Sequence, residues 1–160
     1  GGLPLVAEDL GYITDDVLAL RDAFGLPGMR VLQFAFSGDP ANPHLPEHYP
    51  ANAVGYTGTH DNDTLLGWYR GLDDGTRAWA DALGADRGPM PGALMRVLLE
   101  SAVNTAILPM QDVLGLDGSH RMNRPGRAEG NWTWRFGRSA VDRPLAARLR
   151  DAISATGRLR

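Results

Sequence analysis

The chain has 160 residues, a length that suits one domain with a sizeable core. Hydrophobic residues make up 43% and charged residues 22%, which is typical of a globular protein and excludes a disordered chain. The formal net charge of -3 provides no basic face for nucleic acid, and no apolar run approaches the ~20 residues of a membrane span. Because the chain has no cysteine, disulfides, thiolate metal sites and a cysteine nucleophile are excluded.

The first part of the chain predicts a strand followed by a helix. The apolar run LPLVA at residues 3–7 ends at two acids and is typical of a strand buried on both faces. A helical pattern then begins at Thr14, with acids in its first turn, and stops at Gly25. Its apolar residues share one face at helical spacing: Val17, Leu20 and Phe24.

The rest of the chain continues this alternation. Further strands are predicted at residues 29–36, 53–57 and 105–110, the last with Pro109 at its end. Further helices are predicted at residues 65–70, 76–83, 91–104 and 141–154. Residues 37–50 and 111–136 are predicted to be long loops. Alternating strands and helices predict an α/β fold with a parallel sheet, and we assign residues 1–160 to one domain. Four such strands fit either an open sheet or half of an eight-stranded barrel.

Polar side chains follow three of the predicted strands. Glu8 and Asp9 end the first strand, residues 60–63 (HDND) follow the third, and Gln111 and Asp112 follow the fourth. In parallel α/β folds, ligands bind at the carboxyl ends of the strands. This layout therefore predicts a barrel active site.

The acids and the histidine divide into structural and chemical candidates. Glu8, Asp9 and His60, each taken alone, also fit ordinary structural roles in a loop or turn. Asp63 directly precedes the next helical pattern and is predicted to be its N-cap. Asp61 lies before that cap and gains nothing obvious for stability. Paired with Glu8, it predicts two carboxylates that face one substrate, as in glycosyl transfer.

Aromatic residues in or near the loops on this side favour a sugar ligand, because the apolar faces of sugars stack on such rings. These residues are Tyr49, Tyr56, Trp68, Tyr69, Trp132 and Trp134, although core packing is the preferred role for Trp68 and for Trp79. Trp132 and Trp134 alternate, so one is expected to face the core and the other the cleft, and the sequence leaves open which. P-loop, GxGxxG, HExxH and GxSxG patterns do not occur, which argues against a nucleotide site, a zinc site and a serine hydrolase.

Five segments of the chain, in this order, carry a specific resemblance. They read AEDLGYITDDVLALRDAFGLPGMRVLQFAF, NPHLPEHYP, YTGTHDNDTLLGWY, QDVLGLDGSHRMNRPG and GNWTWRF. Together they resemble the C-terminal part of the 4-alpha-glucanotransferases, also called amylomaltases or disproportionating enzymes, of glycoside hydrolase family 77. The resemblance covers nearly the whole chain and implies the C-terminal half of a (β/α)8 barrel, strands 5 to 8 with their helices.

The resemblance also implies an activity and residue roles. Members transfer a segment of an α-1,4-glucan to the 4-hydroxyl of another glucan or of glucose, with retention and without a metal or other cofactor. Glu8 would be the general acid/base, and Asp61 would hold sugar hydroxyls and stabilise the transition state. His60 would bind the same sugar, and the wall near the cleavage point would include Asp9, Phe34 and Asn123. Residues 37–50 and the RMNRPG loop would shape the acceptor side.

One departure from the family pattern affects the chemistry. The family's nucleophile is an aspartate in an R-x-D-H-F-R-G-like stretch before the AEDLG strand, and no such stretch occurs here. We therefore expect a fragment that lacks the first half of the barrel and is inactive alone. A smaller departure is Glu47, where a histidine is expected. Two alternatives stay open, an α-amylase-type retaining glucan hydrolase and a non-catalytic glucan-binding remnant. The lack of cysteine and of a secretory signal at the start fits a cytoplasmic location.

Overall fold

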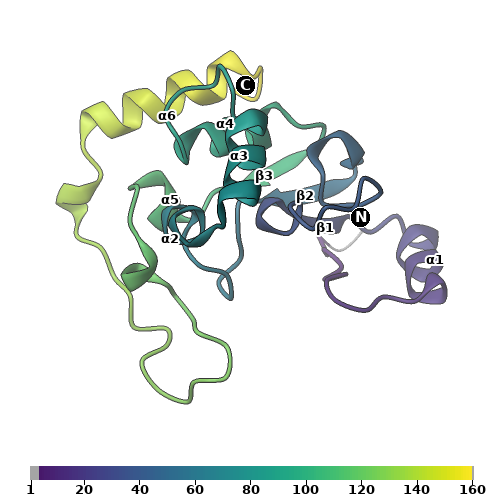
Figure 1. Cartoon of the computed structure of the whole chain (residues 1–160). Coiled ribbons are helices and arrows are strands. Elements are labelled where there is room, and N and C mark those ends of the chain that lie inside the picture. The colour runs from purple at the N-terminus through teal and green to yellow at the C-terminus, as the bar shows by residue number, and fades with distance from the viewer. Residues whose placement is uncertain (1–3, 160) are drawn as a thin grey trace.

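The computed structural model describes residues 4–159, and its centre is a parallel three-stranded sheet (Figure 1). The strands β1 (Gly28–Val31), β2 (Ala53–Tyr56) and β3 (Thr105–Ile107) lie in the order β1-β2-β3. Gly28 pairs with Ala53, and Val54 pairs with Thr105. The parallel α/β architecture predicted from the sequence is confirmed. All three strands therefore point their carboxyl ends to the same edge of the sheet.

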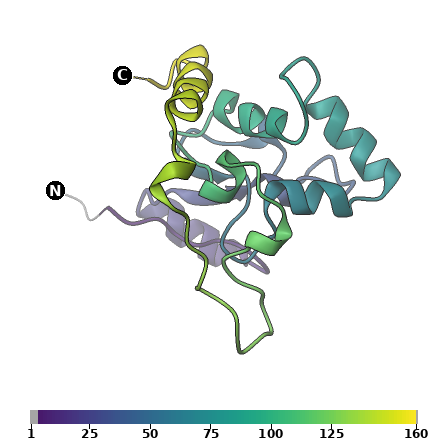
Figure 2. The ribbon, with the colours of Figure 1, turned by 90° about the vertical axis from the view of Figure 1, so that its left-hand side faces the viewer.

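Six α-helices accompany the sheet in residues 4–159. They are α1 (Asp15–Ala23), α2 (Leu65–Gly71), α3 (Asp74–Leu83), α4 (Gly92–Glu100), α5 (Met110–Val113) and α6 (Arg143–Ala155). Figure 1 shows α6 beside α4, with which it packs, whereas α1 stands apart beyond β1. The view in Figure 2 shows the loop between the 3-10 turns Gly118–His120 and Arg138–Ala140 extending away from the rest. No helix in the described part of the chain is both long and apolar enough to cross a membrane.

The core lies between the sheet and the helices. One cluster of buried side chains gathers residues from after β1 and from α2, α3 and α4: Leu32, Ala35, Leu45, Leu65, Ala80, Leu94 and Val97. A second cluster joins Tyr49 and Ala53 to Leu98 and Val103. Each fully buried leucine or valine contributes about 1.5–3 kcal/mol. Gly55 lets α4 approach β2, because a Cβ there would lie 2.7 Å from Leu98 Cδ1. This packing fixes the strand ends that carry the site.

The predicted first strand, residues 3–7, is not a strand over residues 4–7, and Leu3 lies outside the described residues. Leu5 and Val6 are 53% and 48% exposed. A strand requires a ladder of hydrogen bonds to a neighbour. Within the described residues this run makes one backbone bond, from Ala7 N–H to Pro27 O at 2.9 Å. The apolar pattern was therefore insufficient without a paired strand.

Two other predicted strands are shorter than expected. The one predicted at residues 29–36 ends at Val31 and continues as a 3-10 turn, Leu32–Phe34. Asn42 Nδ2 donates to Phe34 O and Ala35 O at 2.8 and 3.2 Å, so this side chain takes carbonyls that a ladder would use. The one predicted at residues 105–110 ends at Ile107, and α5 begins directly after Pro109, which cannot donate to a ladder.

The helices differ from prediction mainly at their ends. The helix predicted at residues 91–104 stops at Glu100, where Ser101 Oγ donates to Leu98 O at 2.7 Å. Thr14 is the N-cap of α1 by position, but its hydroxyl donates to Asp16 instead of accepting from the helix. The apolar face of α1 is exposed, with Phe24 at 72%. Helix α1 is thus held to the rest of the chain by polar contacts near its C-terminal end, such as that between Arg21 and Asp9, and not by a buried face.

Candidate active site

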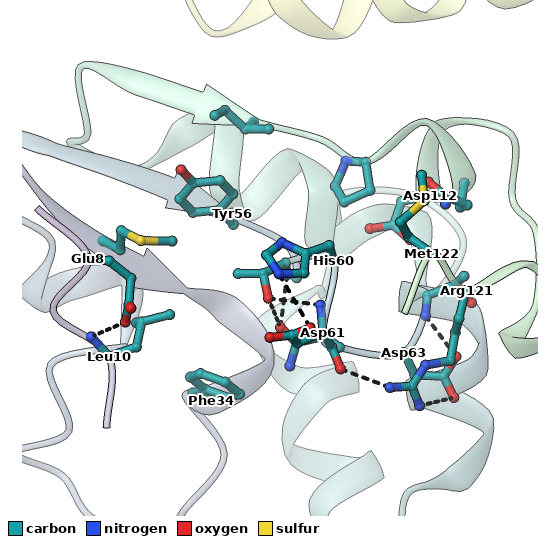
Figure 3. A pocket seen from close by; sticks show the side chains of 18 of the residues that line it. Glu8, Leu10, Phe34, Tyr56, His60, Asp61, Asp63, Asp112, Arg121 and Met122 are labelled. Carbon is teal, nitrogen blue, oxygen red and sulfur yellow. Dashed lines mark hydrogen bonds and ion pairs between the residues drawn. The ribbon is translucent and has the colours of Figure 1, made fainter. Parts of the chain in front are cut away.

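A cavity of about 1070 Å³ opens at the carboxyl ends of the three strands (Figure 3). Its lining includes polar and aromatic side chains from segments that are far apart in sequence: Glu8, Phe34, His60, Asp61, Asp112 and Trp132. The parallel sheet causes this convergence, because strand ends meet at one edge. The cavity lies at the strand ends, where the sequence analysis expected an active site.

Asp61 and His60 lie together on the loop that follows β2. His60 Nε2 is 3.3 Å from Asp61 Oδ1, and both side chains are about half exposed. Asn123 Nδ2 donates to the same Asp61 oxygen at 2.6 Å, and Arg121 donates to Asp61 O at 2.8 Å. The carboxylate is thus oriented by protein donors while it stays accessible from the cavity.

Glu8 reaches the same cavity from the N-terminal segment. Leu10 N–H donates to Glu8 Oε1 at 3.0 Å, which turns the chain back toward the carboxylate. Figure 3 shows Glu8 on a separate segment from Asp61, with Phe34 near the space between them. The two carboxylates singled out from the sequence therefore border one cavity.

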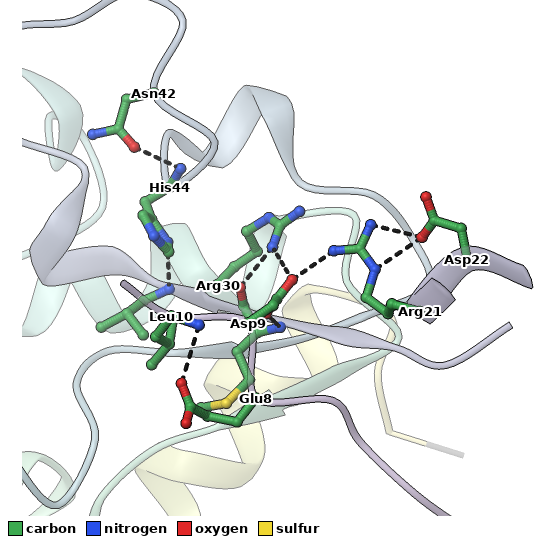
Figure 4. A network of polar contacts seen from close by, with 10 residues as sticks. Glu8, Asp9, Leu10, Arg21, Asp22, Arg30, Asn42 and His44 are labelled. Atoms are coloured by element: carbon green, nitrogen blue, oxygen red, sulfur yellow. Dashed lines mark hydrogen bonds and ion pairs between the residues drawn. The ribbon is translucent and has the colours of Figure 1, made fainter. Parts of the chain in front are cut away.

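Asp9 is placed differently from our expectation, because its side chain points away from the cavity. The carboxylate is only 4% exposed and binds Arg21 at 2.5 Å and Arg30 at 3.5 Å (Figure 4). It also accepts from Met29 N–H at 2.6 Å. Asp9 therefore ties α1 and β1 to the segment that carries Glu8, and the structure gives it an anchoring position instead of one in the wall.

Phe34 lines the cavity, as expected, and rests on a neutral histidine. Its ring meets the His44 ring edge-on, with centroids 5.4 Å apart. Val31 N–H donates to His44 Nδ1 at 3.1 Å, which requires that nitrogen to be unprotonated. Burial, and secondarily the positive charge of Arg30, lowers the pKa of His44. The neutral ring gives Phe34 a fixed support.

The two tryptophans have different surroundings, and Trp132 is the one at the cavity. Trp132 faces the cavity, and its ring centroid lies 5.0 Å from that of His60. Its backbone is left-handed, with φ 62°, and its N–H donates to Met122 O at 2.8 Å. Trp134 does not line the cavity, and its Nε1–H donates to His120 Nδ1 at 3.1 Å. Its ring stacks on Phe136 and belongs to neither core cluster, so the expectation that it faces the core is wrong.

Arg121 is a site residue that the residue-by-residue reasoning missed. It lines the cavity, bonds the Asp61 backbone and lies 3.9 Å from Asp63 Oδ2. The sequence analysis named only the RMNRPG loop that contains Arg121, and this loop was the signal from which its place at the site could have been predicted. Asp63 is not the N-cap of α2, as we had predicted. The cap is Thr64, whose Oγ1 accepts from Gly67 N–H at 3.1 Å.

Among residues 4–159, no group of three or more His, Asp or Glu side chains could hold a metal ion. What the cavity presents instead is an accessible carboxylate on each of two segments, a histidine, and aromatic faces. This is a set suited to hydrogen bonding with hydroxyls and to proton transfer.

Residues 1–139 match the sequence profile of the family described as 4-alpha-glucanotransferase. The chain belongs to the 4-alpha-glucanotransferase family. A 4-alpha-glucanotransferase from Thermus thermophilus is 49% identical over 168 residues, which cover 99% of this chain and 34% of the relative. One from Synechocystis is 52% identical over 139 residues, covering 84% of this chain and 27% of the relative.

The structure resembles an amylomaltase from Streptococcus agalactiae in complex with acarbose, with a TM-score of 0.94 and 31% identity. This similarity covers 100% of the chain and 33% of the amylomaltase. It confirms the predicted fold class, an α/β arrangement that forms part of a barrel. The chain thus spans about a third of the length of the 4-alpha-glucanotransferases it matches.

Proposed function

We propose that this chain supplies the general acid/base and the transition-state-stabilising carboxylate of a 4-alpha-glucanotransferase. The reaction moves a segment of an α-1,4-glucan to the 4-hydroxyl of another glucan or of glucose. The observation that carries the proposal is the convergence of Glu8, His60 and Asp61 on one cavity. Family membership supports it independently.

In the proposed reaction, Glu8 first acts as an acid. It gives a proton to the glycosidic oxygen of the leaving glucan while an aspartate nucleophile attacks the anomeric carbon. In this proposal that aspartate would come from outside this chain, since no R-x-D-H-F-R-G-like stretch occurs in it. In retaining enzymes the two carboxyl groups lie about 5–5.5 Å apart, so the nucleophile would stand directly beside Glu8. Glu8 then takes a proton from the acceptor hydroxyl, which displaces the enzyme carboxylate with a second inversion.

His60 and Asp61 would bind hydroxyls of the sugar that is being cleaved. The Asn123 amide holds Asp61 Oδ1, so the carboxylate needs little reorganisation when positive charge develops on the sugar ring. Phe34 and Trp132 offer apolar faces to the same cavity. Preference for a sugar hydroxyl over water would come from acceptor binding and water exclusion by the surrounding loops.

The proposed ligands are α-1,4-glucans and glucose, without a cofactor. The structural neighbour is in complex with acarbose, which supports a sugar-like ligand for this chain. We include a cytoplasmic location in the proposal, because a cysteine-free chain is compatible with a reducing compartment.

The test uses a protein that we call the chimera, in which this chain replaces the matching third of the Thermus thermophilus relative. Incubation with maltotriose should yield glucose together with longer glucans. Transfer conserves the number of reducing ends, whereas hydrolysis adds one for every bond broken. A folded chimera that raises the reducing-end yield in step with glucose would instead identify a hydrolase. A folded chimera that does neither would support a non-catalytic remnant, and the unmodified relative is the control.

A further inference from the structure

Asp112 is a buried carboxylate that the mechanism above does not use. It lies on α5 and is 5% exposed. Its two oxygens have different partners. Thr57 Oγ1–H donates to Oδ2 at 2.6 Å, and Leu65 N–H donates to Oδ1 at 2.7 Å.

These two partners are the ends of one loop. Thr57 directly follows β2, and Leu65 is the first residue of α2. Between them lies the segment that carries His60 and Asp61. A single carboxylate, brought in from a position 47 and 55 residues away along the chain, therefore closes this loop at its base.

The loop is also braced between its two ends, both by bonds within it and by bonds from Gln33, Arg121 and Asn123 outside it. Asn62 Oδ1 accepts from Thr59 N–H at 2.8 Å and from the Thr59 hydroxyl at 2.9 Å. Gln33 Nε2 donates to Asp63 O at 2.9 Å. We expect a loop braced in this way to pass a change at its base on to His60 and Asp61.

The buried position of Asp112 disfavours the charged form of its carboxylate. Burial raises the pKa of Asp112, the bonds from Leu65 and Thr57 lower it, and the charge of Asp63 adds to the increase. Leu65 N–H belongs to the first turn of α2 and has no acceptor within its own helix, and the residue is 2% exposed. The Asp112 carboxylate therefore satisfies a buried N–H that would otherwise be left without a hydrogen-bond acceptor.

We propose that Asp112 is a positioning residue, which fixes the base of the 57–65 loop and thereby sets where His60 and Asp61 meet the sugar. This inference rests on the proposed function for the identity of the ligand, but the geometry that it claims can be measured without catalysis. Asp112 acts through the loop, because both of its oxygens are occupied by loop donors.

The first experiment uses the chain itself and NMR. Asp112→Ala should speed the amide exchange of Leu65 by at least about tenfold, the effect of losing roughly 1.4 kcal/mol of local stability. It should also shift the His60 ring signals at temperatures well below unfolding. Asp112→Asn should largely restore both readouts, because its carbonyl can accept from Leu65 N–H and its amide can donate to the Thr57 hydroxyl.

Two further variants test the other end of the loop. Thr57→Val keeps the shape of the side chain and removes the hydroxyl, so it should shift the His60 signals, whereas Thr57→Ser should not. Asp117→Ala is the control, because Asp117 is an exposed carboxylate nearby that caps the turn at Ser119. If Asp112→Ala does not fold, the comparison of the two Thr57 variants decides.

The second experiment measures transfer by the chimera. Asp112→Ala should lower kcat for maltotriose by about 10- to 100-fold, as expected from misplacing groups at the reacting centre, and Asp112→Asn should recover most of the rate. If the unsubstituted chimera does not transfer, the proposed function fails while the NMR result still stands. Unchanged His60 signals in Asp112→Ala and Thr57→Val would overturn the positioning role. An Asp112→Asn variant as impaired as Asp112→Ala would overturn it too.

Discussion

Asp9→Ala should release the N-terminal segment that carries Glu8. In the structure, the Asp9 carboxylate accepts from Arg21, Arg30 and Met29 N–H, and it is 4% exposed. Helix α1 has no buried side chain within the described residues, so little apolar packing would replace these contacts. Beside the backbone bond from Ala7 N–H to Pro27 O, the contacts of the Asp9 carboxylate therefore hold this segment.

The size of the loss in local stability depends on which contacts Arg21 and Arg30 keep after the substitution. Removing one partner of a buried ion pair costs about 3–5 kcal/mol. Arg21 would keep its bonds to Asp22, and Arg30 would keep its bond to Met29 O, which argues for the low end of that range. We expect a loss of about 3 kcal/mol in the local free energy of opening, or roughly a hundredfold faster exchange of protected amides.

The assay is hydrogen exchange followed by NMR at Ala7 and Met29, whose amides bond Pro27 O and Asp9. The global free energy of unfolding, measured in urea, should fall by much less, because the core clusters contain no residue of α1.

The control is Asp22→Ala, which removes an exposed partner of the same Arg21 and should lower the local free energy of opening by about 0–1 kcal/mol. Exchange at Met29 that changes less than about threefold in Asp9→Ala would refute the anchoring argument. Equal effects of Asp9→Ala and Asp22→Ala would refute it as well.

Three other outcomes are expected. Since burial lowers the pKa of His44, folding favours the neutral ring, so the chain should lose stability as the pH falls from neutral through 6.5 towards the lowered value. His44→Asn, whose carbonyl can still accept from Val31 N–H, should remove that part of the pH dependence in urea titrations; an unchanged profile would contradict this. Gly58→Ala should lower the free energy of unfolding by about 1–3 kcal/mol, because its Cβ would lie 2.6 Å from Gln33 Nε2 and 3.2 Å from Asn62 Cβ. An unchanged melting temperature would contradict this. The 160-residue chain alone should show no transfer on maltotriose, because it has no nucleophile motif, and release of glucose with longer glucans would disprove that.

Local patterns predicted the elements whose determinants lie within the element. Helix α6 was expected at residues 141–154 and runs Arg143–Ala155, because Asp142 caps it and its apolar stripe packs through Leu145. Strand β2 was also placed closely, at Ala53–Tyr56. The strand expected at residues 3–7 depends on a partner strand, which a local pattern cannot supply.

The candidate site also divides into features that local sequence patterns predict and features that depend on distant parts of the chain. The placement of Glu8 and Asp61 at one cavity could be anticipated from the sequence, because acids after apolar runs are conspicuous. Their catalytic roles stay a prediction. The anchoring position of Asp9 could not be anticipated, since its partner Met29 N–H lies 20 residues away. The bonds of Asp112 to both ends of the His60 loop depend in the same way on contacts that only the folded chain creates.

The most direct test of the account is the transfer rate of the Glu8→Gln chimera on maltotriose. Glutamine keeps the shape of the side chain but cannot give up or take the proton that both halves of the reaction need. General acid–base catalysis contributes about 10²–10⁴-fold, so the rate should fall by at least a hundredfold while the chimera stays folded. A Glu8→Gln chimera that redistributes maltotriose at the unsubstituted rate would contradict the assignment of Glu8 and, with it, the proposed mechanism.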